Sequence, residues 1–280
     1  MKISTSLITL VFLFETKTSY SMGAWNPKSK SNTNASTQSS PSTSQPNVNP
    51  ETASTPDFSD DSDESSVTPA NPDPIEIPQS EKPQVIKGWL EDYSLHIEDK
   101  IQKTYSSLLD IPSSKMNKMC PKWSSLNKAD RAEFWTHLLY AVSIPESSTN
   151  RTLIYLEKSM KTDSVTGYQV RSEGLLQLSY QDVSSYSYKG GDISWTADRS
   201  MAIQDYESDA KYGNPNRSIL NAYANLNLGI HIIYKQVFKY NTSLSLEDAM
   251  GKYWYVMRTS STTEFNKVYT ELKKRFGICF

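Results

Sequence analysis

The sequence predicts an α+β fold that is predominantly α-helical, with one small β excursion, preceded by a disordered segment. Three observations support this prediction. Several stretches between residues 84 and 280 place apolar side chains at helical spacing. A Thr-Gly pair at 166–167 lies between two short β-prone stretches. The residues before position 84 contain too few apolar side chains to offset the entropy that is lost on ordering.

Residues 1–22 have the character of a secretory signal peptide. Lys2 supplies the positive start, residues 3–14 are mostly apolar, and small residues follow at Ser19 and Ser21. A buried N-terminal strand is the alternative, but the order of charge and apolar residues favours export. We therefore expect an exported protein, periplasmic or secreted, without a transmembrane segment after signal cleavage.

Residues 23–83 read as an acidic linker rich in Ser, Thr and Pro, with a cluster of carboxylates at 57–64. This cluster is interpreted as part of a solvated spacer, and a calcium or partner site is the alternative. The remaining residues, 84–280, form one candidate globular domain that is long enough for a single hydrophobic core.

Within this domain, apolar spacing predicts an amphipathic helix over 85–109. A second helix is expected from residue 128 to about 144, with Asn127 as its N-cap, because Pro145 disfavours helical geometry at the preceding residue. A small hairpin is expected over 153–171. Further helices are expected at 218–239, 246–257 and 262–275.

The composition argues against several classes of protein. A formal net charge of -2 gives no support for nucleic-acid binding. The three histidines, His96, His137 and His231, are widely separated, which argues against a histidine-based metal enzyme. Two cysteines do not form a closed zinc site without help from histidine. We expect no metal and no organic cofactor.

Cys120 opens the domain and Cys279 nearly closes the chain. In an exported protein an even pair of cysteines favours a disulfide, and two buried free thiols are the alternative. A Cys–His nucleophile is not supported, because no recognisable motif surrounds either cysteine.

Four short motifs follow one another along the domain. They are Glu146-Ser147, Gly174–Gln177, Asn225–Ile230 and the block Gly251–Arg258. In this order they resemble the lytic transglycosylases and goose-type lysozymes (the SLT-domain family), in a divergent exported branch. The resemblance covers residues 118–280. It implies a lysozyme-like domain that cleaves the MurNAc-GlcNAc β-1,4 bond of peptidoglycan.

The resemblance implies that Glu146 is the catalytic general acid and base. Cleavage of a glycosidic bond requires a proton on the leaving oxygen, and a carboxyl supplies it near neutral pH only when its pKa is raised. A place at the C-terminal end of a helix, with apolar walls from Phe134 and Leu138, would raise the pKa. An exposed loop glutamate is the alternative reading of Glu146.

Four further residues are candidates for substrate binding: Ser147, Leu176, Gln177 and Tyr253. The resemblance places the block around Gln177 beside the acid, and many relatives carry a tyrosine near the catalytic carboxyl. Those relatives have Ala-Tyr-Asn where this chain has Lys252-Tyr253-Trp254. Core packing is therefore the alternative role of Tyr253, and a short buried segment is the alternative for Gln177.

The sequence leaves open whether cleavage is hydrolysis or transglycosylation. Hydrolysis uses a second carboxylate to activate water, whereas in transglycosylation the 6-hydroxyl of the sugar attacks. Glu157 and Asp163 are candidates for a second carboxylate, because they lie in an enlarged excursion over 149–172, and Glu173 and Asp182 are also near in the sequence. Glu157 is also an alternative to Glu146 as the acid. The number of residues between Glu157 and Gly174 is closer to the usual spacing between the acid and this glycine block in the family.

The partner implied by the resemblance is the glycan strand of peptidoglycan, acted on by a monomer. The alternative function is a catalytically silent peptidoglycan-binding domain, which the altered block at 252–254 and Pro145 favour. A structural protein of the cell envelope is a third reading.

Overall fold

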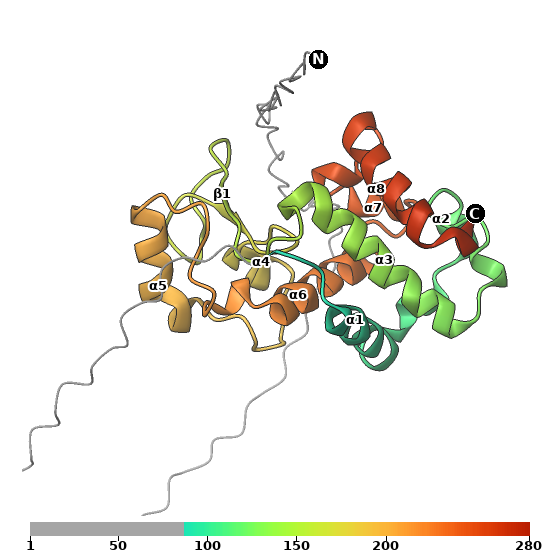
Figure 1. Cartoon of the computed structure of the whole chain (residues 1–280), viewed down its shortest axis with the longest axis horizontal. Coiled ribbons are helices and arrows are strands. Elements are labelled where there is room, and N and C mark those ends of the chain that lie inside the picture. The colour runs from blue at the N-terminus through green and yellow to red at the C-terminus, as the bar shows by residue number, and fades with distance from the viewer. Residues whose placement is uncertain (1–86) are drawn as a thin grey trace, which may run out of the picture. The chain divides into compact units, whose positions relative to one another are not determined.

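The computed structural model describes residues 87–280 and confirms an α+β fold that is mainly helical. Figure 1 shows α1, α3 and α8 gathered at one end of this part of the chain, and β1 and α5 at the other, with α4 between them. The expected signal peptide (1–22) and linker (23–83) lie outside the described residues.

The centre of the helical part is α3 (Lys128–Ser147), which packs against α1 (Glu91–Lys103) and α8 (Thr262–Arg275). Helix α6 (Ala222–Lys235) in turn packs against α1. Asn127 caps α3 as predicted, since its side chain accepts a hydrogen bond from the backbone N–H of Asp130 at 3.0 Å. The inner face of α3 supplies large apolar side chains to the core, among them Phe134, Trp135 and Leu138.

One longer helix, three short helices and six turns complete the helical part. The longer helix is α5 (Trp195–Glu207), and the short helices are α2 (Ser113–Met116), α4 (Tyr180–Ser185) and α7 (Leu246–Met250). The turns are η1 (Ser106–Asp110), η2 (Trp123–Ser125), η3 (Ser218–Leu220), the π-turn η4 (Gln236–Tyr240), η5 (Tyr255–Met257) and η6 (Gly277–Cys279).

The predicted hairpin is present as two short antiparallel strands. Strand β1 (Ile154–Leu156) pairs with β2 (Arg171–Glu173), with Ile154 opposite Glu173. Gly167 lies between the strands with φ +76°, a conformation that suits glycine. The second strand lies just after the stretch 168–170 that the sequence predicted.

Several helix boundaries differ from the prediction. The first helix covers 91–103 rather than 85–109, and the 3-10 helix η1 follows it. The helix expected at 218–239 starts at Ala222, because Asn221 caps it by accepting from the N–H groups of Tyr223 and Ala224. The helix expected at 246–257 ends at Met250 and is followed by η5, whereas 262–275 is confirmed.

The expected end of the second helix at Ile144 is wrong, because α3 continues through Pro145 to Ser147. A proline lacks only one intrahelical hydrogen bond, and other bonds hold the last turn. Ser147 Oγ donates to the carbonyl of Ser143 at 3.1 Å. The backbone N–H of Ser148, which has φ +54°, donates to the carbonyl of Ile144 at 2.9 Å.

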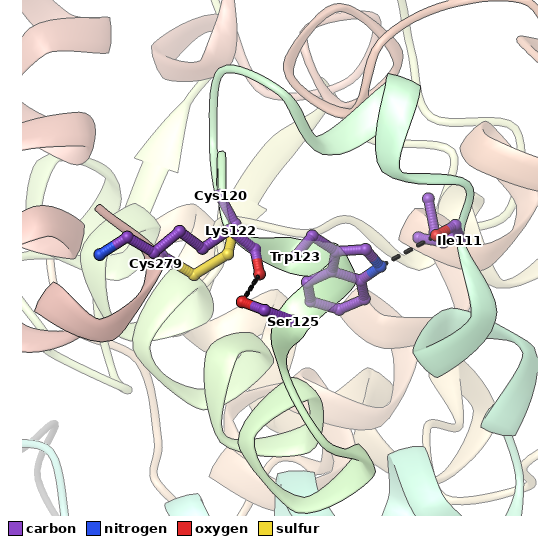
Figure 2. The surroundings of a disulfide bond; sticks show 6 residues. All are labelled: Ile111, Cys120, Lys122, Trp123, Ser125 and Cys279. Carbon is purple, nitrogen blue, oxygen red and sulfur yellow. Dashed lines mark hydrogen bonds between the residues drawn. A yellow bond between two sulfur atoms is a disulfide. The ribbon is translucent and has the colours of Figure 1, made fainter.

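The predicted disulfide joins Cys120 to Cys279 across 159 positions of sequence (Figure 2). The backbone N–H of Lys122 donates to the Cys279 carbonyl at 3.1 Å, and the indole N–H of the buried Trp123 donates to the Ile111 carbonyl at 2.9 Å. The disulfide therefore joins η6 to the segment that leads into η2. Such a link typically stabilises a fold by about 2–4 kcal/mol.

Across residues 87–280, every helix is too short or too polar to cross a membrane. The same residues contain no group of three His, Cys, Asp or Glu side chains arranged to hold a metal ion.

Candidate functional site

Glu146 lies in the last turn of α3 and is half-buried. Its neighbour Ser147 is buried, and Ser147 Oγ donates to the carbonyl of Leu175 at 2.8 Å. This bond attaches the end of α3 to the Gly174–Gln177 turn, 28 residues further along the chain. Glu146 therefore does not lie in a free loop, and its place relative to the turn is determined by its neighbour.

The other two motifs meet at the same turn. The backbone N–H of Leu176 donates to Asn225 Oδ1 at 2.9 Å, and the indole N–H of Trp254 donates to the carbonyl of Leu176 at 3.0 Å. Four segments that are far apart in the sequence are thus joined at two consecutive residues, Leu175 and Leu176. The order of motifs in the sequence corresponds to one cluster in space.

Asn225 is the main support of the turn, because all its polar atoms are engaged. Its Nδ2 donates to the carbonyls of Glu173 at 3.0 Å and Ile219 at 3.1 Å, while its Oδ1 binds Leu176. Gly174 has φ +81°, and a Cβ placed on it would lie 2.5 Å from Asn225 Nδ2. Only glycine fits here without displacing the asparagine.

We expect Gly174→Ala to lower the free energy of unfolding by about 1–3 kcal/mol, through backbone strain and overpacking against Asn225. Gly167→Ala is the matched control, because Gly167 also has positive φ but its Cβ would have no atom within 4 Å. Urea unfolding of both variants measures the difference. Equal losses in the two variants would show that contact with Asn225 does not matter.

Three of the predicted binding residues are buried within or against the turn. Leu176 is fully buried, and a Cβ added to Gly229 of α6 would lie 2.2 Å from Leu176 Cδ1, so helix and side chain are in close contact. Gln177 is 5% exposed, and its Nε2 donates to the Gly174 carbonyl at 2.9 Å. Ser147 is buried as described above. We therefore assign all three to holding the turn in place.

Tyr253 is partly buried, and Trp254, the residue after it, binds the same turn as Ser147. Its hydroxyl donates to Asp182 Oδ2 at 2.6 Å. Burial, followed by the negative charges of Asp182 and, to a smaller extent, Glu146, holds the pKa of Tyr253 well above its usual range. The phenol therefore stays neutral at any physiological pH.

Asp182 is a residue of this site that the motifs did not identify. It lies in the first turn of α4, where burial raises the pKa of its carboxyl while hydrogen bonds from Tyr253 and Ser179 oppose that rise. Its distance of 71 positions from Tyr253 explains why the sequence contains no signal for the pair.

The two candidates for a second carboxylate differ in their surroundings. Glu157 follows β1 and is 6% exposed, its Oε1 accepts a hydrogen bond from Ser172 Oγ at 2.6 Å, and burial raises its pKa. Asp163 accepts from the backbone N–H groups of Val165 at 2.7 Å and Thr166 at 3.0 Å. Asp163 also accepts from the N–H of Gln181 at 3.2 Å, so it organises the hairpin loop. Glu157 is the better candidate of the two.

A buried ionic cluster lies next to the turn. Arg217, with no exposed side-chain surface, pairs with Glu173 and with Asp205, the latter at 2.9 Å. Tyr206 also donates to Glu173, whose pKa is raised by burial and lowered by Arg217. Because Glu173 precedes Gly174, this cluster connects α5 and η3 to the start of the turn.

A pocket of about 420 Å³ lies along α4. Its walls are mainly aromatic and apolar, with hydroxyls and one lysine: Val165, Tyr180, Val183, Ser184, Ser187, Tyr188, Lys189, Ile193 and Trp195. Trp195 is held there by stacking on Tyr206, with ring centroids 6.3 Å apart. Such a mixture of rings and hydroxyls suits a polar ligand with apolar faces.

No protein-family model matches the chain. Among curated proteins, too, no match is found. Solved structures of the Bdellovibrio protein DslA (Bd0314) are similar to it. The wild-type form is 24% identical with a TM-score of 0.49, covering 70% of this chain and 98% of that one. Two Glu-to-Gln variants of DslA are 23% and 22% identical with TM-scores of 0.48, each covering 68% of this chain and 91% of the other. At these values the likeness assigns neither a family nor an activity to the chain.

Proposed function

We propose that this protein is an exported peptidoglycan glycosidase of the lytic transglycosylase or lysozyme type, with a lysozyme-like domain and with Glu146 as its general acid and base. One observation carries the proposal: the four motifs that suggested the family converge on Leu175 and Leu176, at the end of the helix that bears Glu146. Ser147, Asn225 and Trp254 bind the backbone of this turn, and Glu146, which precedes Ser147, is half-buried.

In the proposed reaction, the Glu146 carboxyl donates its proton to the oxygen between MurNAc and GlcNAc. The bond from this oxygen to the anomeric carbon breaks, and the leaving sugar departs with a free hydroxyl. The Glu146 carboxylate then takes a proton from the hydroxyl that attacks the anomeric carbon. The partial negative charge at the C-terminal end of α3 favours the protonated carboxyl before the reaction.

The attacking hydroxyl belongs either to water or to the 6-position of the MurNAc ring. Attack by water leaves a reducing end, and attack by the 6-hydroxyl leaves a 1,6-anhydro end. Glu157 is the residue that would assist water. Burial raises the pKa of Glu157, and its hydrogen bond to Ser172 acts in the opposite direction, toward the ionised form that a base requires.

The proposed location, periplasmic or secreted, is supported by the disulfide, because disulfides persist in oxidising compartments. The signal-like residues 1–22 support the same location. We further propose that the protein acts as a monomer on glycan strands, without a metal or an organic cofactor.

The function is tested by incubating the protein with purified sacculi and measuring both soluble muropeptides and protein that sediments with the wall. We expect release of muropeptides that increases with time. Sedimentation without release would support the second candidate, a silent peptidoglycan-binding domain, which the altered block at 252–254 favours. If the protein neither releases muropeptides nor sediments with the wall, both proposals are wrong.

A further inference from the structure

Asp182 is a buried carboxylate next to the candidate site, and the proposed reaction does not use it. It is 7% exposed. Its Oδ2 accepts hydrogen bonds from the backbone N–H of Ser179 at 2.7 Å, from Ser179 Oγ at 2.8 Å and from the hydroxyl of Tyr253 at 2.6 Å. A capping box needs only the first of these bonds, so the bond to Tyr253, a residue 71 positions away, requires another explanation.

The convergence of these donors determines where the phenol proton lies. A backbone N–H only donates, so Ser179 requires an acceptor at Oδ2. Burial raises the pKa of Asp182, and the three donors around one oxygen oppose that rise by favouring the ionised carboxylate. Because Tyr253 has a single hydroxyl proton and gives it to Asp182, its oxygen can act only as an acceptor toward its other neighbours.

Glu146 and Tyr253 are joined to the same turn through the residues that follow them. Ser147, which follows Glu146, binds the carbonyl of Leu175, and Trp254, which follows Tyr253, binds the carbonyl of Leu176. The two pairs of residues are thus attached to consecutive positions of one turn. The charge of Glu146 acts on the phenol of Tyr253, which agrees with this closeness.

We propose that Asp182 is a positioning residue that accepts the hydrogen bond of the Tyr253 hydroxyl, so that the phenol oxygen accepts a hydrogen bond from the protonated Glu146 carboxyl. The inference rests on the proposed role of Glu146. A hydrogen bond to the neutral form of a carboxyl favours that form, and the nearby negative charge of Asp182 acts in the same direction. After proton transfer, the Glu146 carboxylate faces an oxygen that offers it no proton, so it readily takes one back from the attacking hydroxyl.

The test uses the full chain and measures the pKa of Glu146 directly, by NMR titration of its side-chain carboxyl carbon, with Glu146→Gln to assign the signal. In Asp182→Asn the charge is lost, and the new amide can donate to the phenol, which then turns its proton to Glu146. We expect the pKa of Glu146 to fall by about one unit or more. The alkaline limb of the pH-activity profile should move to lower pH by a similar amount.

Asp248→Asn is the matched control. Asp248 occupies the equivalent position in α7, where Ser245 Oγ binds Asp248 Oδ2 at 3.0 Å, but Asp248 is exposed and has no bond to Tyr253. We expect this variant to leave the pKa of Glu146 unchanged. An equal fall in both variants would indicate a general effect of a weakened helix cap and would overturn the inference.

Tyr253→Phe shows whether Asp182 affects the pKa of Glu146 through the Tyr253 hydroxyl or by direct electrostatic interaction. We expect the pKa of Glu146 to fall in this variant, and Asp182→Asn to add much less to that fall than it causes alone. An undiminished shift in the Phe background would overturn the positioning role. If Asp182→Asn fails to fold, Tyr253→Phe alone decides, because an unchanged or higher pKa of Glu146 there contradicts the accepting role of the phenol.

The pKa measurement does not depend on activity, so the two proposals can fail separately. A fall in the pKa of Glu146 without any muropeptide release by the wild type would support the role of Asp182 and refute the glycosidase. Muropeptide release with an unchanged pKa in Asp182→Asn would support the glycosidase and refute the role of Asp182.

Discussion

Replacement of Glu146 by Gln is expected to lower the rate of muropeptide release by about 100-fold to 10,000-fold, the usual contribution of a general acid. Glutamine keeps the shape of the side chain and removes the transferable proton. Because Ser147 and not Glu146 binds the Leu175 carbonyl, the turn and the fold should persist. The measurement is the initial rate of release from purified sacculi, with thermal unfolding as a check of folding.

Glu133→Gln is the control for this prediction, since Glu133 is an exposed carboxylate on the same helix and binds only His137 nearby. This variant should retain the wild-type rate. Glu157→Gln adds a second comparison. Loss of muropeptide release in Glu157→Gln, with full activity in Glu146→Gln, would identify Glu157 as the general acid in place of Glu146. Retention of the wild-type rate by Glu146→Gln would by itself refute the proposed acid.

Replacement of Arg217 by Met is expected to lower the free energy of unfolding by about 3–5 kcal/mol, because it leaves two buried carboxylates without their cation. Glu173 and Asp205 are 0% and 4% exposed, so water does not compensate for the loss. Urea unfolding measures the change. Since Glu173 precedes the Gly174–Gln177 turn, we also expect weaker protection of the Leu176 amide from hydrogen exchange.

Lys267→Met is the control for Arg217, because Lys267 forms an exposed pair with Glu264 at 2.9 Å. An exposed pair of this kind contributes at most about 1 kcal/mol. Combining Arg217→Met with Glu173→Gln and Asp205→Asn should recover part of the lost stability, since the stranded charges are then removed. A loss below that of Lys267→Met would show that the cluster does not hold the region together.

The elements that the sequence predicted well are those whose signal is local. Helices α3 and α8 were found because apolar residues recur at helical spacing, and Asn127 marked the start of α3. The hairpin was found because a Thr-Gly pair marks its turn. The disulfide followed from two cysteines in a protein expected to be exported.

Helix α5 was missed because its inner face is largely polar. The side chains it buries include Asp198 and Asp205, which bind Ser218 and Arg217, so apolar periodicity is absent. The predicted helix end before Pro145 was wrong. A proline only disfavours helical geometry at the residue before it, and the two hydrogen bonds of Ser147 outweigh that preference.

The sequence motifs predicted some residues of the candidate site, but not the long-range contacts that hold the site together. The motifs identified Glu146 and Tyr253, yet Asp182 and Arg217 belong to no motif. Their partners, Tyr253 and Glu173, lie 71 and 44 positions away, and only tertiary packing brings them together. The inward direction of the Gln177 amide depends on its φ of +52°, which the sequence does not indicate.

Mass spectrometry of the soluble products from purified sacculi tests the central claim most directly. Cleavage between MurNAc and GlcNAc with Glu146 as proton donor predicts new MurNAc ends, either 1,6-anhydro or reducing, in the wild-type digest and their near absence with Glu146→Gln. Products with intact glycan strands that are cut only in the peptides, or the same new ends with both proteins, would contradict the account.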